Sequence, residues 1–542
     1  MQTTRALLVF PRFGTSSFWA LRDVCAVWGA RCPAPPLGLI TVAALLPRTW
    51  SVRLVDRNAE TLLDSDIDWA DIVLTGGMLP QRPDTLDVID RAHRRGKPVV
   101  VGGPDVMSSP GAFEKADFLI VGEAEAIMSE FVGAWESGRR GGVFKAEKFK
   151  VDITTSPIPR FDLLTFRNYL YIGVQFSRGC PFNCEFCDII ELFGRVPRPK
   201  TTPQMLAELQ ALYDLGYRGH VDFVDDNLIG NKRALKQFLP HLATWQKARR
   251  YPFQFSTEAS LNLADDADLL GMMSAANFFA IFTGIESPDT ETLVHAQKKQ
   301  NTRRDIADSV HRIYAAGMFV IAGFIVGFDT ERDAVDRGIV DCIEATGIPV
   351  CMAGLLTALP NTQLSRRLER EGRLLPIVIP GDAAAAGDQC TAGLNFVTLR
   401  PRRQVLSDYR SVLATVYRPA DYFAHVRRVG RQLRRPKLDI KVDGAGLQHQ
   451  LRALRRLLRQ SWRPGMRWQF WRTVADVLVH NPAAFEFVLI LCAFYLHLGP
   501  FSRYVIAELD RQIADVESAS DGLQPGGAGG SAPRLRSLEA SL

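Results

Sequence analysis

The chain has 542 residues, which is long for one domain and predicts about two to four of them. Hydrophobic residues make up 47% and charged residues 23% of the chain. This globular composition excludes a disordered chain, a collagen-like repeat and a polytopic membrane protein. The formal net charge of +6 is modest, so the position of the charge along the chain matters more than its sum.

Cysteine usage indicates the cellular compartment. The chain has nine cysteines, an odd count at low density, unlike a secreted disulfide scaffold. The first residues, MQTTRALLVFPRF, lack the basic, apolar and small-residue segments of a secretory signal peptide. We therefore expect a reducing, cytoplasmic environment.

The first 150 residues form a pattern of alternating strands and helices. Short β-branched runs predict strands at residues 5–10, 51–55, 71–75, 98–101 and 117–121. Helical patterns fall between them, for example at residues 37–46 and 84–95. Near-continuous apolar strands separated by helices predict a parallel sheet covered by helices on both faces.

Glycines follow most of these predicted strands, at Gly76, Gly77, Gly102, Gly103 and Gly122. Glycine lets a backbone approach a ligand closely, and open α/β sheets bind ligands at this edge. The G-x-G-x-x-G pattern of a dinucleotide site is missing. The alternative is that these glycines only form tight turns between strands and helices.

A linker is expected over residues 151–170, followed by a second α/β region over residues 171–360. Strands are predicted at residues 171–177, 220–225, 253–256, 279–283, 319–326 and 350–357, with helices such as 202–215 and 303–316 between them. Six such units suit a partial (β/α)6 barrel, whose chemistry lies at the carboxyl ends of the strands. Polar residues and glycines gather at those ends.

Residues 361–515 have a different character, with helical patterns and dense arginine. Residues 451–475 hold seven arginines and the tryptophans Trp462, Trp468 and Trp471, with no acidic residue. This composition suits an anionic membrane surface, and a solvated basic face is the alternative. No RNA-binding module is recognisable, so no nucleic-acid partner is expected.

Two further C-terminal segments have distinct compositions. Residues 485–498 are apolar but, at 14 residues, shorter than a membrane-spanning helix, which indicates either an interfacial segment or a buried core helix. Residues 516–542 begin with a run rich in Gly, Ser, Pro and Ala, which predicts a disordered tail.

The strongest local signal is a C-x3-C-x2-C loop formed by Cys180, Cys184 and Cys187, directly after a predicted strand. Three thiolates this close can bind one metal centre. Structural zinc normally takes four ligands, and no fourth Cys or His lies nearby in the sequence. An iron–sulfur cluster held by three cysteines keeps one iron open, as catalysis requires, so the spacing favours a cluster over zinc.

This motif at the start of a βα barrel resembles the radical S-adenosylmethionine (SAM) superfamily. The resemblance implies that Cys180, Cys184 and Cys187 hold a [4Fe–4S] cluster and that SAM binds the open iron. It also implies a reducing partner such as flavodoxin or ferredoxin. The order of the domains over residues 5–360 is similar to the cobalamin-dependent branch of this superfamily, in which a Rossmann-like domain precedes the barrel.

The cobalamin resemblance implies that Gly76, Gly77, Gly102, Gly103 and Gly122 line the corrin ring and its nucleotide tail. The D-x-H-x-x-G motif that supplies an axial histidine in base-off cobalamin proteins is missing here. Residues 56–60, DRNAE, stand in its place after the second predicted strand. The sequence therefore does not identify the lower axial ligand of the cobalt.

Within the barrel, the resemblance implies further contacts to SAM. Asp225 and Asp226 resemble the polar motif near the SAM amino group, and Glu258 and Glu286 would reach its ribose or methionine part. The run from Gly323 to Gly327 resembles the motif near adenine. For each carboxylate, the alternative is a capping or ion-pairing role at the end of a strand.

Several phrases resemble a narrower family, the hopanoid C-2 methylases. They are PLGLITVAALLP (36–47), TGGMLPQ (75–81), SRGCPFNCEFCDIIELFGRVPR (177–198), GHVDFVDDNLIGNK (219–232) and PVCMAGLLTALPNTQL (349–364). This resemblance implies a hydrophobic triterpenoid substrate methylated at C-2, and peripheral contact with the cytoplasmic face of the inner membrane. The alternatives are another lipid or natural product, an oxidative cyclase of the porphyrin type, and a non-catalytic cobalamin sensor.

Overall fold

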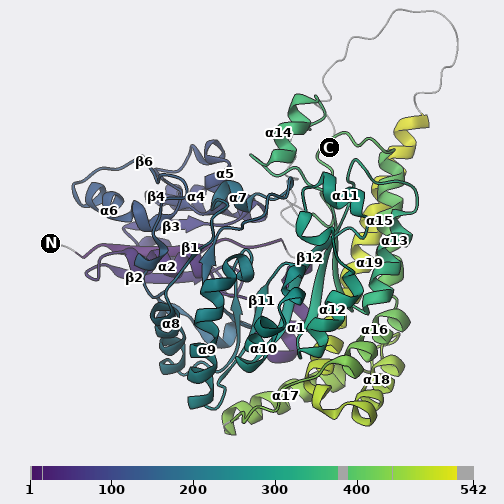
Figure 1. Cartoon of the computed structure of the whole chain (residues 1–542). Helices are drawn as coiled ribbons and strands as arrows, with labels where there is room; N and C mark the ends of the chain where they lie inside the picture. The colour runs from purple at the N-terminus through teal and green to yellow at the C-terminus, as the bar shows by residue number, and fades with distance from the viewer. Residues whose placement is uncertain (1–2, 15, 376–388, 442–443, 522–542) are drawn as a thin grey trace, which may run out of the picture.

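The computed structural model describes residues 3–14, 16–375, 389–441 and 444–521. Two parallel six-stranded sheets lie side by side, and a helical C-terminal region packs against the second sheet (Figure 1). The expected fold class, a Rossmann-like α/β domain with a partial (β/α)6 barrel and a mainly helical extension, is confirmed.

The first sheet has the strand order β2-β1-β3-β4-β5-β6, and all its pairs are parallel. Its strands are β1 (Arg5–Phe10), β2 (Ser51–Asp56), β3 (Ile72–Gly76), β4 (Val99–Gly102), β5 (Phe118–Val121) and β6 (Gly142–Lys145). Its helices include α2 (Leu37–Leu45), α3 (Asp64–Trp69), α4 (Arg82–Arg94), α5 (Pro104–Ser108) and α6 (Met128–Glu136). The sequence patterns missed β6, an edge strand in which only Phe144 is buried.

The segment between β1 and α2 leaves the first sheet. It carries α1 (Arg22–Trp28), which packs against helices α17 and α19 of the C-terminal region. His497 of α19 hydrogen-bonds through Nε2 to the carbonyl of Ser17, 3.1 Å away. The N-terminal and C-terminal regions are therefore joined by packing that local sequence patterns do not indicate.

The second sheet has the order β14-β13-β12-β11-β10-β7, again all parallel, with β7 and β14 as its two edges. Its strands are β7 (Ile172–Val174), β10 (Gly219–Phe223), β11 (Phe253–Glu258), β12 (Phe278–Glu286), β13 (Phe319–Val326) and β14 (Val350–Leu355). Its longer helices are α8 (Thr202–Asp214), α9 (Lys232–Ala248), α10 (Ala267–Ala275), α12 (Ile306–Ala315) and α13 (Val335–Thr346). A short antiparallel hairpin of β8 (Ser177–Arg178) and β9 (Arg198–Pro199) brackets the cysteine motif.

The C-terminal region is helical, as predicted. Its helices are α14 (Gln363–Arg370), α15 (Arg402–Val416), α16 (Pro419–Gln432), α17 (Gly444–Gln460), α18 (Arg467–His480) and α19 (Phe485–Asp521). The expected tail boundary is wrong, because α19 continues through residues 516–521. The rest of the expected tail, residues 522–542, lies outside the described residues.

The apolar segment 485–498 is much longer as a helix than its composition indicates. Within the described residues, one helical stretch, Pro482–Ser518, is long and apolar enough to cross a membrane by length and composition alone. However, 61% of its apolar window is buried, and α19 packs against α1, α15, α16 and α18. Of the two readings of this segment, the structure supports the core helix, and the inference that it is too short to span is corrected.

Candidate functional site

A cavity of about 2090 Å³ extends from the first sheet into the barrel. The loops after β3 and β4 contribute Met78 and Pro104, and the barrel contributes Asp226 and Glu258. Its far end is walled by α17 and α19. Because the edges of both sheets border this one space, ligands of the two domains would lie next to each other.

The three cysteines lie in the loop between β8 and β9, and none of them is among the residues that line the cavity. Cys184 is buried, and Cys180 and Cys187 are half-buried. The amide of Gln300 donates to Cys184 Sγ at 3.6 Å, and the amide of Asn227 donates to Cys180 Sγ at 3.9 Å. Such bonds stabilise thiolates and tune a bound cluster.

The donor set fits an iron–sulfur cluster better than zinc. Burial raises the pKa of both Cys180 and Cys187, and the neighbouring Cys184 raises both further. Metal binding would have to displace these protons. Among the described residues, no group of three or more His, Cys, Asp or Glu side chains could hold a metal ion. Three cysteine thiolates are soft donors, which suit an iron–sulfur cluster with one iron left for another ligand, whereas structural zinc takes four protein ligands.

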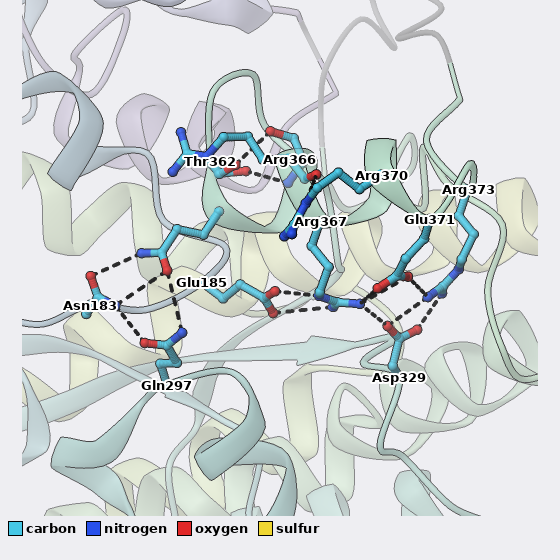
Figure 2. A network of polar contacts seen from close by, with 12 residues as sticks. Asn183, Glu185, Gln297, Asp329, Thr362, Arg366, Arg367, Arg370, Glu371 and Arg373 are labelled. Carbon is cyan, nitrogen blue, oxygen red and sulfur yellow. Dashed lines mark hydrogen bonds and ion pairs between the residues drawn. The ribbon is translucent and has the colours of Figure 1, made fainter.

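A polar network fixes the cysteine loop to the barrel and to α14 (Figure 2). Arg367 of α14 forms ion pairs with Glu185 of the loop at 2.5 Å and with Asp329, which follows β13, at 2.8 Å. Burial alone would raise the pKa of Asp329, but hydrogen bonds from Arg373 and Arg367 lower it. Residues far apart in sequence thus hold the loop in one conformation.

Asn183 of the loop joins the same network. Its amide donates to Gln297 at 2.6 Å and accepts from Gln363 of α14 at 3.1 Å (Figure 2). The backbone N–H of Glu185 also donates to the carbonyl of Ala296.

Ion pairs join the two domains directly beside this loop. Arg178, two residues before Cys180, pairs with Glu123 at 3.0 Å and with Glu125 at 2.7 Å. Arg198 of β9 pairs with Glu123 at 2.9 Å. Burial alone would raise the pKa of Glu125, but Arg178 lowers it. The charges that follow β5 therefore position the hairpin that carries the cysteines.

The predicted pair Asp225 and Asp226 divides into two roles. Asp225 is buried and accepts hydrogen bonds from the N–H of Phe176 at 2.9 Å and the hydroxyl of Ser177 at 2.7 Å. Asp226 accepts from the N–H of Gly179 at 2.8 Å and also lines the cavity. Burial raises the pKa of Asp225 to about 7 and that of Asp226 to about 6. Asp226 is thus the better placed of the two for a ligand.

Glu258, the last residue of β11, opens into the cavity. Its side chain is accessible from the cavity although it lies deep in the molecule. Burial, followed by repulsion from Asp222, Asp226 and Asp225, raises its pKa to about 8. A cationic ligand would remove that repulsion.

Glu286, the last residue of β12, forms a buried ion pair with Lys298 at 2.7 Å. Burial alone would lower the pKa of Lys298, but Glu286 and Cys184 raise it. Glu286 is absent from the walls of the described cavity. The ion-pairing alternative is therefore the one that its geometry supports.

The two glycines of the predicted adenine motif, Gly323 on β13 and Gly327 just after it, occupy different surroundings. Gly323 pairs with Gly284 across β12 and β13. Gly327 has φ +114°, its N–H donates to the Glu331 carboxylate at 2.9 Å, and a Cβ there would lie 2.6 Å from Leu394. Neither glycine lines the described cavity.

The five predicted glycines of the first sheet lie at its cavity edge, but their neighbours form the wall. A Cβ on Gly76 would lie 2.1 Å from the carbonyl oxygen of Gly102, and one on Gly122 would lie 2.8 Å from Ala146. Close packing thus accounts for glycine at both positions. Gly76, Gly77, Gly102, Gly103 and Gly122 are absent from the lining of the described cavity.

Sequence reasoning missed a polar cluster inside the barrel. His220 Nε2 lies 2.6 Å from the hydroxyl of Ser256, which donates to Asp222, and all three line the cavity. Burial lowers the pKa of His220 to about 3 and raises that of Asp222 to about 6. The available signal was the two-residue spacing of His220 and Asp222, which places both on one face of a strand.

Comparison with known families gives two matches along the chain. Residues 174–337 match the radical SAM superfamily, and residues 362–511 match a domain of unknown function. The first match contains the cysteine loop and most of the barrel strands.

Three individual proteins resemble the chain over most of its length. An uncharacterized methyltransferase of Synechocystis sp. is 43% identical, covering 95% of each chain. The hopanoid C-2 methylase of Rhodopseudomonas palustris is 35% identical, covering 93% of this chain and 94% of its own. The radical SAM methyltransferase TsrM of Kitasatospora setae, solved with cobalamin and a [4Fe–4S] cluster, superposes with a TM-score of 0.59 at 14% identity, covering 89% of this chain and 100% of its own.

Proposed function

Since this chain belongs to the radical SAM methyltransferases and has the fold of their cobalamin-dependent members, we propose that it methylates C-2 of a hopanoid. The observation that carries this proposal is the large cavity shared by the edges of both sheets. The 35% identity to a hopanoid C-2 methylase supports the choice of substrate. The cofactors expected from the sequence, a [4Fe–4S] cluster, SAM and cobalamin, agree with the family and the fold.

The reaction explains why such cofactors are needed. The C-2 hydrogen of a saturated triterpenoid is not acidic, and the carbon is not a nucleophile, so neither a general base nor ordinary SAM methylation suffices. When bound, these cofactors supply a hydrogen-abstracting radical and a methyl group. Per product, two SAM and two electrons would yield S-adenosylhomocysteine, 5′-deoxyadenosine, methionine and a C–CH3 bond in place of C–H.

The residues of this chain would hold and separate the reacting groups. Cys180, Cys184 and Cys187 would ligate the cluster, and Asp226 and Glu258 would face the SAM cation. The loops after β3 and β4 would border the cobalamin. The apolar barrel wall, including Phe282, Ile321 and Met352, would exclude water from the carbon radical.

Anaerobically purified protein, reconstituted with iron, sulfide and cobalamin, tests this proposal. With a hopene, SAM and reduced flavodoxin, mass spectrometry should show a product heavier by one methylene unit. A product lacking only hydrogen would indicate the cyclase alternative. No product, despite formation of 5′-deoxyadenosine, would indicate a different lipid or natural product.

The reducing partner is part of the same proposal. A small flavodoxin or ferredoxin would supply the electrons, and a chemical reductant should replace it in the assay. Contact with a membrane is also expected for a lipid substrate, and it depends on the side chains that the protein exposes.

A further inference from the structure

Helix α18 lies at the lower edge of the molecule (Figure 1). It exposes a stripe of apolar side chains. Trp468, Trp471, Leu478 and Val479 are 75%, 38%, 50% and 77% exposed. Their spacing of three, seven and one places them on one side of the helix. The opposite side already buries core residues such as Phe470, so the stripe adds nothing to the core.

Trp462, in the turn before α18, extends this stripe. It is 63% exposed, and its ring centroid lies 6.1 Å from that of Trp471. We call Trp462, Trp468, Trp471, Leu478 and Val479 together the α18 stripe. A continuous exposed surface of this kind is typical of a binding site rather than of scattered surface apolar residues.

Exposed arginines without acidic partners lie on α18 and on the preceding helix α17. Arg455, Arg459, Arg467 and Arg472 are exposed, and none forms an ion pair with any residue that the structure describes. No Asp or Glu occurs between residues 444 and 475, and Asp476, the acidic residue of α18, is paired with Arg431. Uncompensated positive charge beside exposed tryptophan matches the surface of an anionic bilayer, where rings lie at headgroup depth and arginines contact phosphate.

We propose that the α18 stripe and its arginines dock this protein on an anionic lipid bilayer. The apolar side chains would enter the headgroup region, and α19 would stay in the protein core rather than span the membrane. Exposed apolar surface alone would also suit a protein partner, but the excess of positive charge favours lipid.

The position of this surface relative to the cavity extends the proposal, and this step rests on the proposed function. Helix α17, which directly precedes α18, walls the far end of the cavity through Leu454 and Leu457. Leu447 and Leu451 of α17 line the cavity and are also 51% and 56% exposed. The docking face thus lies on the helix that follows this wall of the cavity, and a lipid substrate would enter from the bilayer past α17.

Vesicle flotation with the full-length protein, without substrate, tests the docking. Binding is expected with phosphatidylglycerol vesicles, with little binding to phosphatidylcholine vesicles and weakening at high salt. The pair Trp468→Ser and Val479→Ser should reduce binding at least about tenfold. The pair Arg467→Gln and Arg472→Gln should reduce it about fivefold for each arginine.

Matched control variants lie on the first domain. Val143, 62% exposed on β6, and Arg94, exposed on α4, are changed in the same way, as Val143→Ser and Arg94→Gln, and should leave vesicle binding unchanged. Equal binding to both vesicle types, or no effect of the stripe variants, would overturn the proposal. So would self-association without lipid that the stripe variants abolish, because the stripe would then face a second copy.

A second readout separates docking from catalysis. In detergent, where no bilayer is present, the stripe variants should methylate solubilised hopanoid at the unaltered rate. Vesicle binding without any hopanoid product would refute the proposed substrate and leave docking intact. Product without vesicle binding would refute docking alone.

Discussion

The two parallel sheets border the same cavity but present it with different chemistry. The first sheet ends in glycines and contributes Met78 and Pro104, without a carboxylate cluster. The barrel contributes Asp226 and Glu258, together with Asp188, which directly follows Cys187 of the cysteine loop. The barrel edge is thus suited to cations by charge, whereas the glycines of the first sheet pack against neighbouring residues and do not line the cavity. The comparison shows how one architecture serves two cofactors through the residues at its strand ends.

The largest effect is expected at the metal-binding edge. Cys184→Ala should abolish the visible absorbance of the cluster and all 5′-deoxyadenosine formation, because two thiolates cannot hold a cubane in place. Cobalamin binding to the other sheet should persist. Cys342→Ala, outside the loop, serves as the control and should keep its iron. Loss of cobalamin together with iron in Cys184→Ala would contradict the division between the edges.

A second substitution targets the edge of the first sheet, where cobalamin is expected to bind. In Gly76→Ala the new Cβ would lie 2.1 Å from the Gly102 carbonyl, so the ends of β3 and β4 must separate. We expect a loss of about 1–3 kcal/mol in the free energy of unfolding, and less bound cobalamin at unchanged iron content. Gly133→Ala in α6, where a Cβ meets no atom within 4 Å, is the matched control. Full cobalamin occupancy in Gly76→Ala would show that this edge does not shape the site.

Ion pairs of Arg178 with Glu123 and Glu125 connect the barrel to the first domain. Arg178→Met leaves Glu125 buried without its partner and should destabilise the protein by about 3 kcal/mol in chemical denaturation. The folded-state pKa of Glu125 lies below its ordinary 4.5, so this contribution is complete above that pH and decreases as the pH falls below it. The difference between variant and parent should therefore shrink in acid. A constant difference across pH would exclude this ion pair as its cause.

The smallest effect is expected from Glu258. Its folded-state pKa of about 8 exceeds its ordinary value, so in the cofactor-free protein it lowers stability as the pH rises from about 4.5 to 8. Glu258→Gln should match the parent near pH 4.5 and exceed it by about 1–3 °C in Tm at pH 8. Thermal unfolding across this range measures the difference. With SAM bound the gain should vanish or reverse, if Glu258 faces a cation.

Much of the fold could be predicted from local patterns. Eleven of the twelve main-sheet strands overlap ranges that apolar, β-branched runs in the sequence predict. The exceptions to such patterns are β6, which is mostly exposed, and the two-residue strands β8 and β9, which are too short to show a period. The cysteine loop could be predicted because its ligands are close in sequence.

The polar cluster in the barrel could not be predicted in the same way. Asp222 and Ser256 are direct partners in the register of β10 and β11, a pairing between residues 34 positions apart. The same holds for Lys298, whose role depends on Glu286 across a turn of the barrel. Strand register and loop packing decide these contacts, and neither leaves a local signature.

The sequence by itself determined the thiol motif, the alternation of strands and helices, and the excess of arginine near the C-terminus, because each is a property of neighbouring residues. Only the tertiary structure decided that the segment carrying α1 crosses to the C-terminal helices, that α19 is mostly buried, and that the tryptophans of α18 stay outside. Burial depends on which distant surfaces meet. An apolar helix therefore has the same local pattern whether it packs against protein or faces a bilayer.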